Sequence, residues 1–264
     1  MLTLRRLYSR PSAEPKPAVP AGTRVYAVGD VHGCAALFEA LIEAIEKDDA
    51  TRGAATTTIV LLGDLIDRGP DSAGVIASAR RLAEKRPVRL IMGNHEEMFL
   101  ASLESDEVLR DFLRYGGRET ALSYGIDPAA YHAADIARTG ELLRAHVPVS
   151  DIAFIEAFED QVGIGDYLFV HAGVRPDVAL DEQKPSDLHW IRGPFLAQDD
   201  GYGAVIVHGH TIFAKPEVKA GRIGIDTGAY ATGRLTALGL EGTRRWLIEA
   251  QDKDGVVTTT QRSI

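Results

Sequence analysis

The sequence predicts an α/β fold in which two mixed β-sheets pack as a sandwich, with helices flanking the sheets and a helical insertion. Two observations lead to this prediction: the first part of the chain alternates short apolar strands with helices, and the last part consists of short strands separated by turns. The 264 residues, 45% hydrophobic and 25% charged, have the ordinary composition of a folded protein that is large enough to bury a core.

The first part of the chain contains three units in which an apolar strand leads into a helix with apolar residues at helical spacing. The strands are expected at Arg24–Gly29, Thr57–Leu62 and Val88–Met92, and the helices at Ala35–Ile45, Asp71–Glu84 and Glu96–Leu103. Three such units predict a parallel or mixed sheet with crossover helices.

The middle of the chain, Ser105–Phe158, reads as a helical insertion with breaks at Gly116-Gly117, at Gly125 to Pro128 and at Pro148. Seven short strands follow, and they imply a second sheet. They are expected at Gln161–Ile164, Tyr167–Val170, Ala204–Val207, Glu217–Ile225, Leu235–Leu240, Arg245–Ala250 and Val256–Thr260.

The N-terminal residues, the single cysteine and the net charge indicate the domain boundary and the compartment to expect. Residues 1–22 contain four prolines between Pro11 and Pro20 and predict a poorly ordered lead-in, so a single domain is expected over residues 23–264. No apolar run predicts a membrane helix or a secretory signal, and the single Cys34 fits a reducing compartment, which favours the cytoplasm. The net charge of −9 disfavours a stable complex with nucleic acid, and the oligomeric state is left open.

Polar residues follow five of the predicted strands. They are Asp30 and His32, Asp64 and Asp67, Asn94 and His95, His171, and His210. Each one alone is explained by a turn or a helix cap, but five such sites in order along the chain are not explained by unrelated turns. Ligands collect beyond the carboxyl ends of the strands in sheets of this kind, so we expect Asp30, Asp64 and Asn94 to converge on one edge.

The ordered set of motifs closely resembles the metallophosphoesterase (calcineurin-like) superfamily and, within it, the bacterial type of phosphoprotein phosphatase. The resemblance runs from about Arg24 to Leu240. It rests on GDVHG at Gly29–Gly33, GDLIDRG at Gly63–Gly69, GNHE at Gly93–Glu96, the histidine of HAG at His171, and GHT at Gly209–Thr211.

The resemblance implies a centre of two divalent metals. One metal would be held by Asp30, His32 and Asp64, and the other by Asp64, Asn94, His171 and His210. Imidazole, carboxylate and amide oxygen ligands suit Mn²⁺, the expected ion, as well as Fe or Zn²⁺. The wider superfamily has a second histidine where this chain has Ile212, which favours the phosphoprotein phosphatase branch, and His208 is interpreted as lying behind the ligands.

The family pattern also implies the catalytic groups. A hydroxide bridging the two metals would attack phosphorus directly, so that no protein nucleophile is required. His95 would protonate the leaving group and Asp67 would orient its imidazole, while Arg68 and Arg192 would bind the phosphoryl oxygens.

Two other phosphatase chemistries are disfavoured by spacing. A cysteine phosphatase needs an arginine six residues after its nucleophile, and the residue six after Cys34 is Ala40. The aspartate pair in Asp252-Lys253-Asp254 lies between two predicted strands near the end of the chain, and we interpret it as a hairpin loop.

The leading hypothesis from the sequence is a phosphatase of phosphoserine and phosphothreonine, acting on a phosphoprotein or a small phosphorylated substrate. The alternative is a symmetrical diadenosine tetraphosphatase. Against it, this chain has Asp67 before Arg68 and Glu96 after His95, where those relatives more often have Ala and Asp. A binding module without catalysis is disfavoured because every position expected to hold metal is intact.

Overall fold

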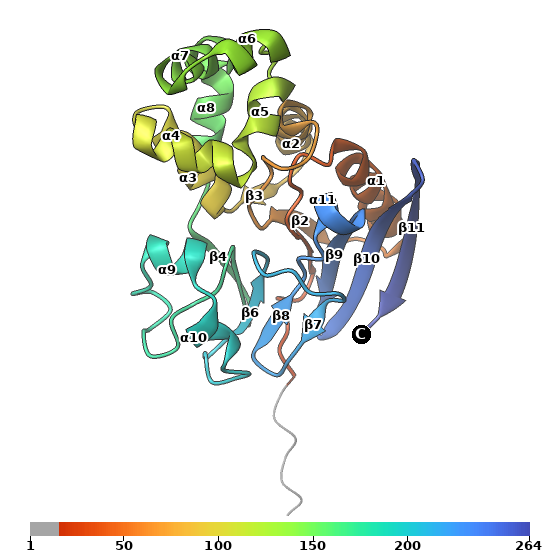
Figure 1. Ribbon diagram of the computed structural model, residues 1–264. Helices are drawn as coiled ribbons and strands as arrows, with labels where there is room; N and C mark the ends of the chain where they lie inside the picture. Colours follow the sequence, from red (N-terminus) through yellow and green to blue (C-terminus); the bar gives the residue numbers. More distant parts are fainter. Residues whose placement is uncertain (1–15) are drawn as a thin grey trace, which may run out of the picture.

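Two β-sheets lie face to face in the computed structural model of the chain, which describes residues 16–264 (Figure 1). Apolar side chains from both sheets fill the space between them, among them Val25 and Val60 from one sheet and Phe169 and Val207 from the other, all completely buried. Helices cover the outside. The predicted α/β class with two mixed sheets is confirmed.

The first sheet has the strand order β11-β10-β9-β1-β2-β3, and β1, β2 and β3 are parallel. Its strands are β1 (Thr23–Val28), β2 (Thr56–Leu61), β3 (Val88–Leu90), β9 (Arg234–Glu241), β10 (Arg244–Lys253) and β11 (Val256–Ser263). The three predicted helices are present: α1 (Ala35–Thr51) and α2 (Ser72–Lys85) cross from β1 to β2 and from β2 to β3, and α3 (Asn94–Ser102) follows the edge strand β3. Apolar residues of α1, such as Phe38 and Leu41, pack with Tyr26 and Ile59 of the sheet in one core cluster.

The second sheet has the order β4-β5-β6-β8-β7. Its strands are β4 (Gln161–Ile164), β5 (Tyr167–Val170), β6 (Val205–His208), β7 (Glu217–Val218) and β8 (Arg222–Gly224). The single strand predicted at Glu217–Ile225 is therefore wrong. It is a hairpin, because the chain turns back where Lys219 N–H donates to the carbonyl of Arg222.

The last three strands were expected in the second sheet, and this expectation is also wrong. β9 pairs antiparallel with β1, with Val28 opposite Ala237, and thereby extends the first sheet with β10 and β11. An apolar strand pattern shows which residues are buried, but it does not show which sheet edge the strand will join. The loop predicted around Asp252 is confirmed as the turn between β10 and β11, where Gly255 N–H donates to the Asp252 carboxylate at 2.9 Å.

The predicted helical insertion forms a cap above the first sheet (Figure 1). It comprises α4 (Asp106–Phe112), a π-helical turn η1 (Leu113–Gly117), α5 (Arg118–Ser123), α6 (Pro128–Ala133), α7 (Ile136–His146) and α8 (Val149–Glu156). The chain kinks at Gly116 (φ 121°) and turns at Gly125 (φ 83°), which are two of the predicted breaks.

Three short helices do not follow from the sequence pattern, because each is too short to show helical periodicity. They are α9 (Pro185–Trp190), α10 (Gly193–Leu196) and α11 (Ala229–Thr232). The first two lie beside the second sheet, on the other side of the site from the cap helices (Figure 1).

The packed part of the chain begins earlier than the predicted Thr23. Val19 is 3% exposed and donates its N–H to the carbonyl of Gly242, and Ala18 N–H donates to the Asp166 carboxylate at 2.9 Å. Residues 16–22 thus cross between the two sheets, which corrects that part of the predicted lead-in, and residues 1–15 lie outside the described residues. Within the described chain, every helix is too short or too polar to span a bilayer.

The first prediction concerns how the first sheet accommodates Trp246. A Cβ on Gly239 of β9 would lie 2.1 Å from Cε2 of the buried Trp246 ring. We expect Gly239→Ala to lower the free energy of unfolding by about 1–3 kcal/mol, the usual cost of overpacking, as measured by urea denaturation. Gly163→Ala in β4, where a Cβ has open space, is the control. Equal effects of the two substitutions would contradict this packing argument.

Candidate metal centre

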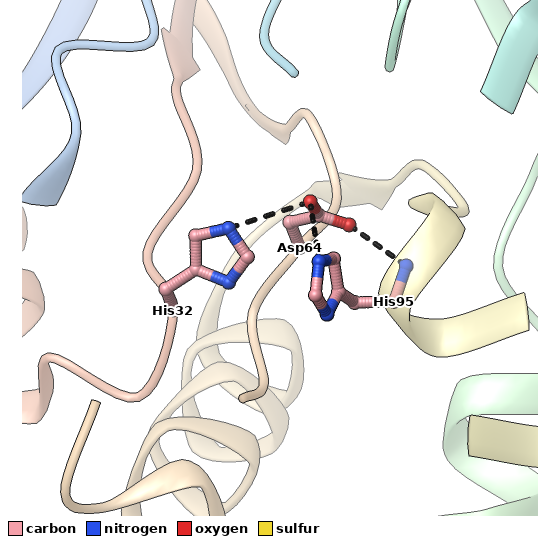
Figure 2. A group of neighbouring side chains, drawn as sticks. All are labelled: His32, Asp64 and His95. Carbon is pink, nitrogen blue, oxygen red and sulfur yellow. Dashed lines mark hydrogen bonds and ion pairs between the residues drawn. The ribbon is translucent and has the colours of Figure 1, made fainter. Parts of the chain in front are cut away.

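Asp64 lies at the centre of the site, directly after β2 and Gly63. Its Oδ1 is 3.4 Å from Nε2 of His171, and its Oδ2 is 3.4 Å from Nε2 of His32. His32 and His95 approach the carboxylate from two sides (Figure 2). One buried carboxylate therefore faces imidazoles that come from the ends of different strands.

His171 has an acceptor atom, Nε2, that faces the oxygens of Asp64 and Asn94. Its Nδ1 lies 2.8 Å from the carbonyl of Leu62, so the ring proton is on Nδ1 and Nε2 carries a lone pair. That Nε2 faces Oδ1 of Asn94 at 3.0 Å and Nδ1 of His210 at 3.1 Å, besides the Asp64 carboxylate. Burial lowers the pKa of His171, which keeps the ring neutral. Nε2 of His171 thus turns a lone pair toward a carboxylate oxygen and an amide oxygen, and facing acceptors of this kind fit a cation.

His32 repeats this arrangement on the other side of Asp64. Its Nδ1 lies 2.8 Å from the carbonyl of Ile66, so the ring proton is on Nδ1. Nε2, which faces the Asp64 carboxylate, therefore carries a lone pair. Burial lowers the pKa of His32 to about 3 and that of His210 to about 2. The two groups of side chains that could each hold a metal are His32, Asp64 and His95, and Asp64, His171 and His210. Asp64 belongs to both groups.

Asp30, expected as a ligand of the first metal, lies at the same site with its carboxylate oxygens 3.0 and 3.1 Å from the backbone N of His210. Burial, together with Asp226 and Asp64, raises its pKa well above the ordinary value. Three buried carboxylates so close together repel one another unless positive charge lies between them.

The third of these carboxylates, Asp226, was missed by the sequence analysis. It is 2% exposed and accepts a hydrogen bond from the N–H of Gly228 at 2.8 Å. Burial and the charge of Asp64 raise its pKa to about 6. Asp226 directly follows Ile225, the end of a strand predicted from the sequence, so the search for polar residues after strand ends that found the other five sites could also have found Asp226.

Glu96 shapes the loop that carries Asp64. Its buried carboxylate accepts hydrogen bonds from the backbone N–H groups of Asp64 (2.8 Å), Leu65 (2.7 Å) and Gly93 (3.1 Å). The motif contained Glu96, but its role of holding the loop by backbone bonds did not follow from the sequence.

Backbone strain is concentrated in the same loops. Six residues other than glycine have positive φ in the described part of the chain, and five of them belong to the site. These five are His32, Asp64, Asp67, Arg68 and His210. Such conformations persist only where surrounding contacts enforce them, as they do at functional sites.

His95 and Asp67 form the expected pair. Nδ1 of His95 lies 2.6 Å from Oδ2 of Asp67, and the hydroxyl of Thr120 in the cap donates to Oδ1 of Asp67 at 2.6 Å. Burial lowers the pKa of His95, but the charges of Asp64 and Asp67 outweigh burial and raise it. His95 is near enough to Asp64 to be a ligand, and the contact of Nδ1 with Asp67 would suit either role, but the raised pKa favours the protonated ring and so a proton donor.

Both predicted arginines lie at the site. Nη1 of Arg68 is 2.7 Å from Nε2 of His32 and Nη2 is 2.7 Å from Nε2 of His95, while Nε of Arg192 donates to Nε2 of His210 at 2.9 Å. The backbone N–H of Arg68 donates to the carbonyl of Gly116 in the cap, where a Cβ would lie 2.7 Å from Cγ of Arg68. The cap thus fixes one of the two arginines.

His208 lies among aromatic rings instead of carboxylates, with ring centroids 4.9 Å from Phe195 and 6.1 Å from Phe213. It is outside both metal-holding groups. Cys34 is partly buried, and burial raises the pKa of its thiol to about 11, which opposes a nucleophilic role.

A second histidine cluster joins α9 to α3. The ring of His189 lies 2.9 Å from the carboxylate of Glu97 through Nδ1 and 3.0 Å from that of Asp160 through Nε2. Nε1 of Trp190 donates to the same Glu97 oxygen at 2.7 Å. This cluster holds the segment that carries Trp190 and Arg192 against the helix that begins at Asn94.

Comparisons with known proteins find a matching family and similar phosphohydrolases. A profile of the family described as calcineurin-like phosphoesterase matches residues 23–248. The asymmetrical bis(5'-nucleosyl)-tetraphosphatase of Geobacillus thermodenitrificans is 27% identical over 237 residues, covering 80% of this chain and 88% of that protein. The symmetrical bis(5'-nucleosyl)-tetraphosphatase of Chromohalobacter salexigens is 27% identical over 262 residues, covering 81% and 94%.

Solved structures share the fold. A structure described as a candidate diadenosine tetraphosphatase has a TM-score of 0.60 at 21% identity and covers 94% of this chain and 98% of its own. A cold-active protein tyrosine phosphatase also has a TM-score of 0.60, at 20% identity, and covers 92% and 81%. At these identities the likeness concerns the fold alone.

The second prediction concerns the His189 cluster. Burial lowers the pKa of His189, but the carboxylates of Glu97 and Asp160 outweigh burial, so the folded-state pKa is raised above the unfolded value. The resulting stabilisation is complete below the unfolded pKa of about 6.5 and is lost as pH rises through the folded pKa. We therefore expect His189→Gln to lower the free energy of unfolding more at about pH 5.5 than at about pH 9.

Urea denaturation at the two pH values measures this difference. His132→Gln, which changes an exposed histidine of α6, is the control. A loss for His189→Gln that is the same at both pH values would show that the histidine acts only by packing.

Proposed function

The chain belongs to the calcineurin-like phosphoesterase family and is a phosphoesterase hydrolase, and on this premise we propose that it hydrolyses bis(5'-nucleosyl) tetraphosphates with the help of two divalent metal ions. The observation that carries the metal part of the proposal is the cluster of buried acceptors around Asp64. The observation that carries the substrate part is the similarity to two kinds of bis(5'-nucleosyl)-tetraphosphatase over about four fifths of the chain.

The residues that would hold the metals are those predicted from the sequence. Asp30, His32 and Asp64 would bind one ion, and Asp64, Asn94, His171 and His210 the other. Nitrogen and oxygen donors of this kind suit Mn²⁺, which we propose as the ion, and also Fe and Zn²⁺. When bound, two such ions lower the pKa of water at the site and neutralise charge that develops on the phosphoryl group.

The side chains around the metals would bind and orient the phosphate chain. Arg68 contacts His32 and Arg192 contacts His210, and their guanidinium groups would each bind phosphate oxygens through paired N–H donors. His95 would hold a proton for the departing phosphate oxygen, with the imidazole oriented by Asp67 through Nδ1. We propose these roles for the four residues together.

The choice of substrate differs from the leading hypothesis of the sequence analysis. The metal and phosphate motifs serve esters and anhydrides alike, so they do not separate a serine/threonine phosphatase from a dinucleotide hydrolase. The relatives named above favour the alternative, a dinucleoside tetraphosphatase. Their names, asymmetrical and symmetrical, refer to cleavage at different bonds of the tetraphosphate. Phosphoserine and phosphothreonine remain a second candidate class, and the cytoplasmic location remains a prediction.

The third prediction tests the substrate. Purified protein supplied with Mn²⁺ should have a higher kcat/KM on diadenosine tetraphosphate than on a phosphoserine or phosphothreonine peptide, because it would bind several phosphates of one chain at once. Separation of the nucleotide products identifies the bond: two ADP for symmetrical cleavage, or AMP and ATP for asymmetrical cleavage. A higher kcat/KM on the peptides would return the assignment to the protein-phosphatase hypothesis.

The fourth prediction tests the shared carboxylate. Substitution of a residue that only hydrogen-bonds a metal ligand typically costs about 10- to 100-fold in metal affinity or activity. Asp64→Asn would alter a proposed ligand of both ions, so it should cost more than about 100-fold in activity. Titration calorimetry with Mn²⁺ should also show weaker binding at both sites. Asp127→Asn at the exposed start of α6 makes the same chemical change and is the control. Full activity after exhaustive chelation would refute the metal centre.

A further inference from the structure

The pocket over the metal centre has a wall that the proposed catalysis does not use. The pocket has a volume of about 350 Å³. Five of its lining residues belong to the site already described, namely Arg68, Asn94, His95, Arg192 and His210. The other three, Met98, Tyr115 and Trp190, present apolar and aromatic surface directly beside the arginines.

The two aromatic side chains come from opposite parts of the fold. Tyr115 lies in the π-helical turn of the cap, and Trp190 is the last residue of α9 beside the second sheet (Figure 1). Tyr115 is 50% exposed and Trp190 is 43% exposed, whereas Met98 is 8% exposed. Two large exposed rings that line one pocket are typical of a binding surface.

Trp190 is held in a fixed orientation. Its Nε1–H donates to the Glu97 carboxylate at 2.7 Å, and the same oxygen is bound by His189 at 2.9 Å. The polar edge of the indole is therefore engaged by the protein, and what the ring still offers to the pocket is apolar surface. A ring fixed in this way loses little side-chain entropy when a flat ligand stacks on it.

We propose that Trp190 and Tyr115 form a stacking subsite for the base of a nucleotide whose phosphates lie against Arg68 and Arg192. This inference rests on the proposed function and deepens it, because it names the part of the substrate that a phosphopeptide lacks. Apart from the Tyr115 hydroxyl, the polar groups that remain available in the pocket belong to the phosphate end, so the base is bound mainly by its face. Diguanosine tetraphosphate should accordingly have a KM within a few fold of that of the adenosine compound.

The first test is a binding measurement that does not depend on catalysis. The chain has two tryptophans, and Trp246 is buried at 2% exposure, so quenching of intrinsic fluorescence by a stacked base reports on Trp190. We expect AMP to quench the fluorescence, and ribose 5-phosphate, which has the same phosphate but no base, to leave it unchanged. Trp190→Phe should abolish the signal while keeping a ring in the subsite.

The second test is kinetic. Stacking on an aromatic side chain is worth about 5- to 150-fold in affinity, so Trp190→Ala and Tyr115→Leu should each raise KM for diadenosine tetraphosphate within that range. Trp190→Phe and Tyr115→Phe keep the rings and should stay within a few fold of the unchanged protein. Inorganic tripolyphosphate, an anhydride without a base, should show unchanged kcat/KM in all four variants, which excludes a general disturbance of Arg192 or the cap.

The outcomes separate the subsite from the proposed function. If the dinucleotide is hydrolysed and neither Trp190→Ala nor Tyr115→Leu raises its KM, the subsite is wrong and the function stands. If the dinucleotide is not hydrolysed but AMP quenches Trp190 and ribose 5-phosphate does not, the function is wrong and the subsite stands. Equal quenching by AMP and ribose 5-phosphate would overturn the subsite under either function.

Discussion

The burial of the Asp64 carboxylate is the constraint on which the rest of the site depends. A carboxylate at 1% exposure, surrounded by neutral imidazoles and by two further buried aspartates, is stable only where positive charge or many N–H donors compensate for lost water. The protein supplies part of that compensation itself. The backbone N–H of His95 donates to Asp64, and Glu96 holds the surrounding backbone in position.

The two sheets surround the buried Asp64 carboxylate with side chains by bringing strand ends together. The carboxyl ends of β1, β2 and β3 lie at one edge of the first sheet, and β5 and β6 deliver His171 and His210 from the second. A strand end is rigid, so the fold itself holds these side chains in place at the site. The left-handed turns after the strands aim the side chains inward, at a cost in backbone strain that the hydrogen bonds of the loops offset.

Most of the fold, and most of the residues that it brings together at the site, could be predicted from sequence, because both follow from local patterns. Apolar runs identify strands, and the residues that follow them identify the edge of the sheet. Contacts between distant segments could not be predicted in this way. Thr120 meets Asp67 across 53 residues, and β9 joins β1 across the whole molecule. The motifs also do not separate the candidate substrate classes, and Tyr115 and Trp190, which line one pocket in the folded chain, lie outside the motifs.

The hydrogen bonds from the cap to Asp67 and Arg68 limit how far the cap can be exchanged without disturbing the site. The helices from α4 to α8 look like a unit that recombination could exchange for another, yet they supply the Gly116 carbonyl to Arg68 and the Thr120 hydroxyl to Asp67. A different cap without a glycine and a hydroxyl at these two places would leave Arg68 and Asp67 without these contacts. The inner turn of the cap is therefore structurally coupled to the loop that carries Asp67 and Arg68.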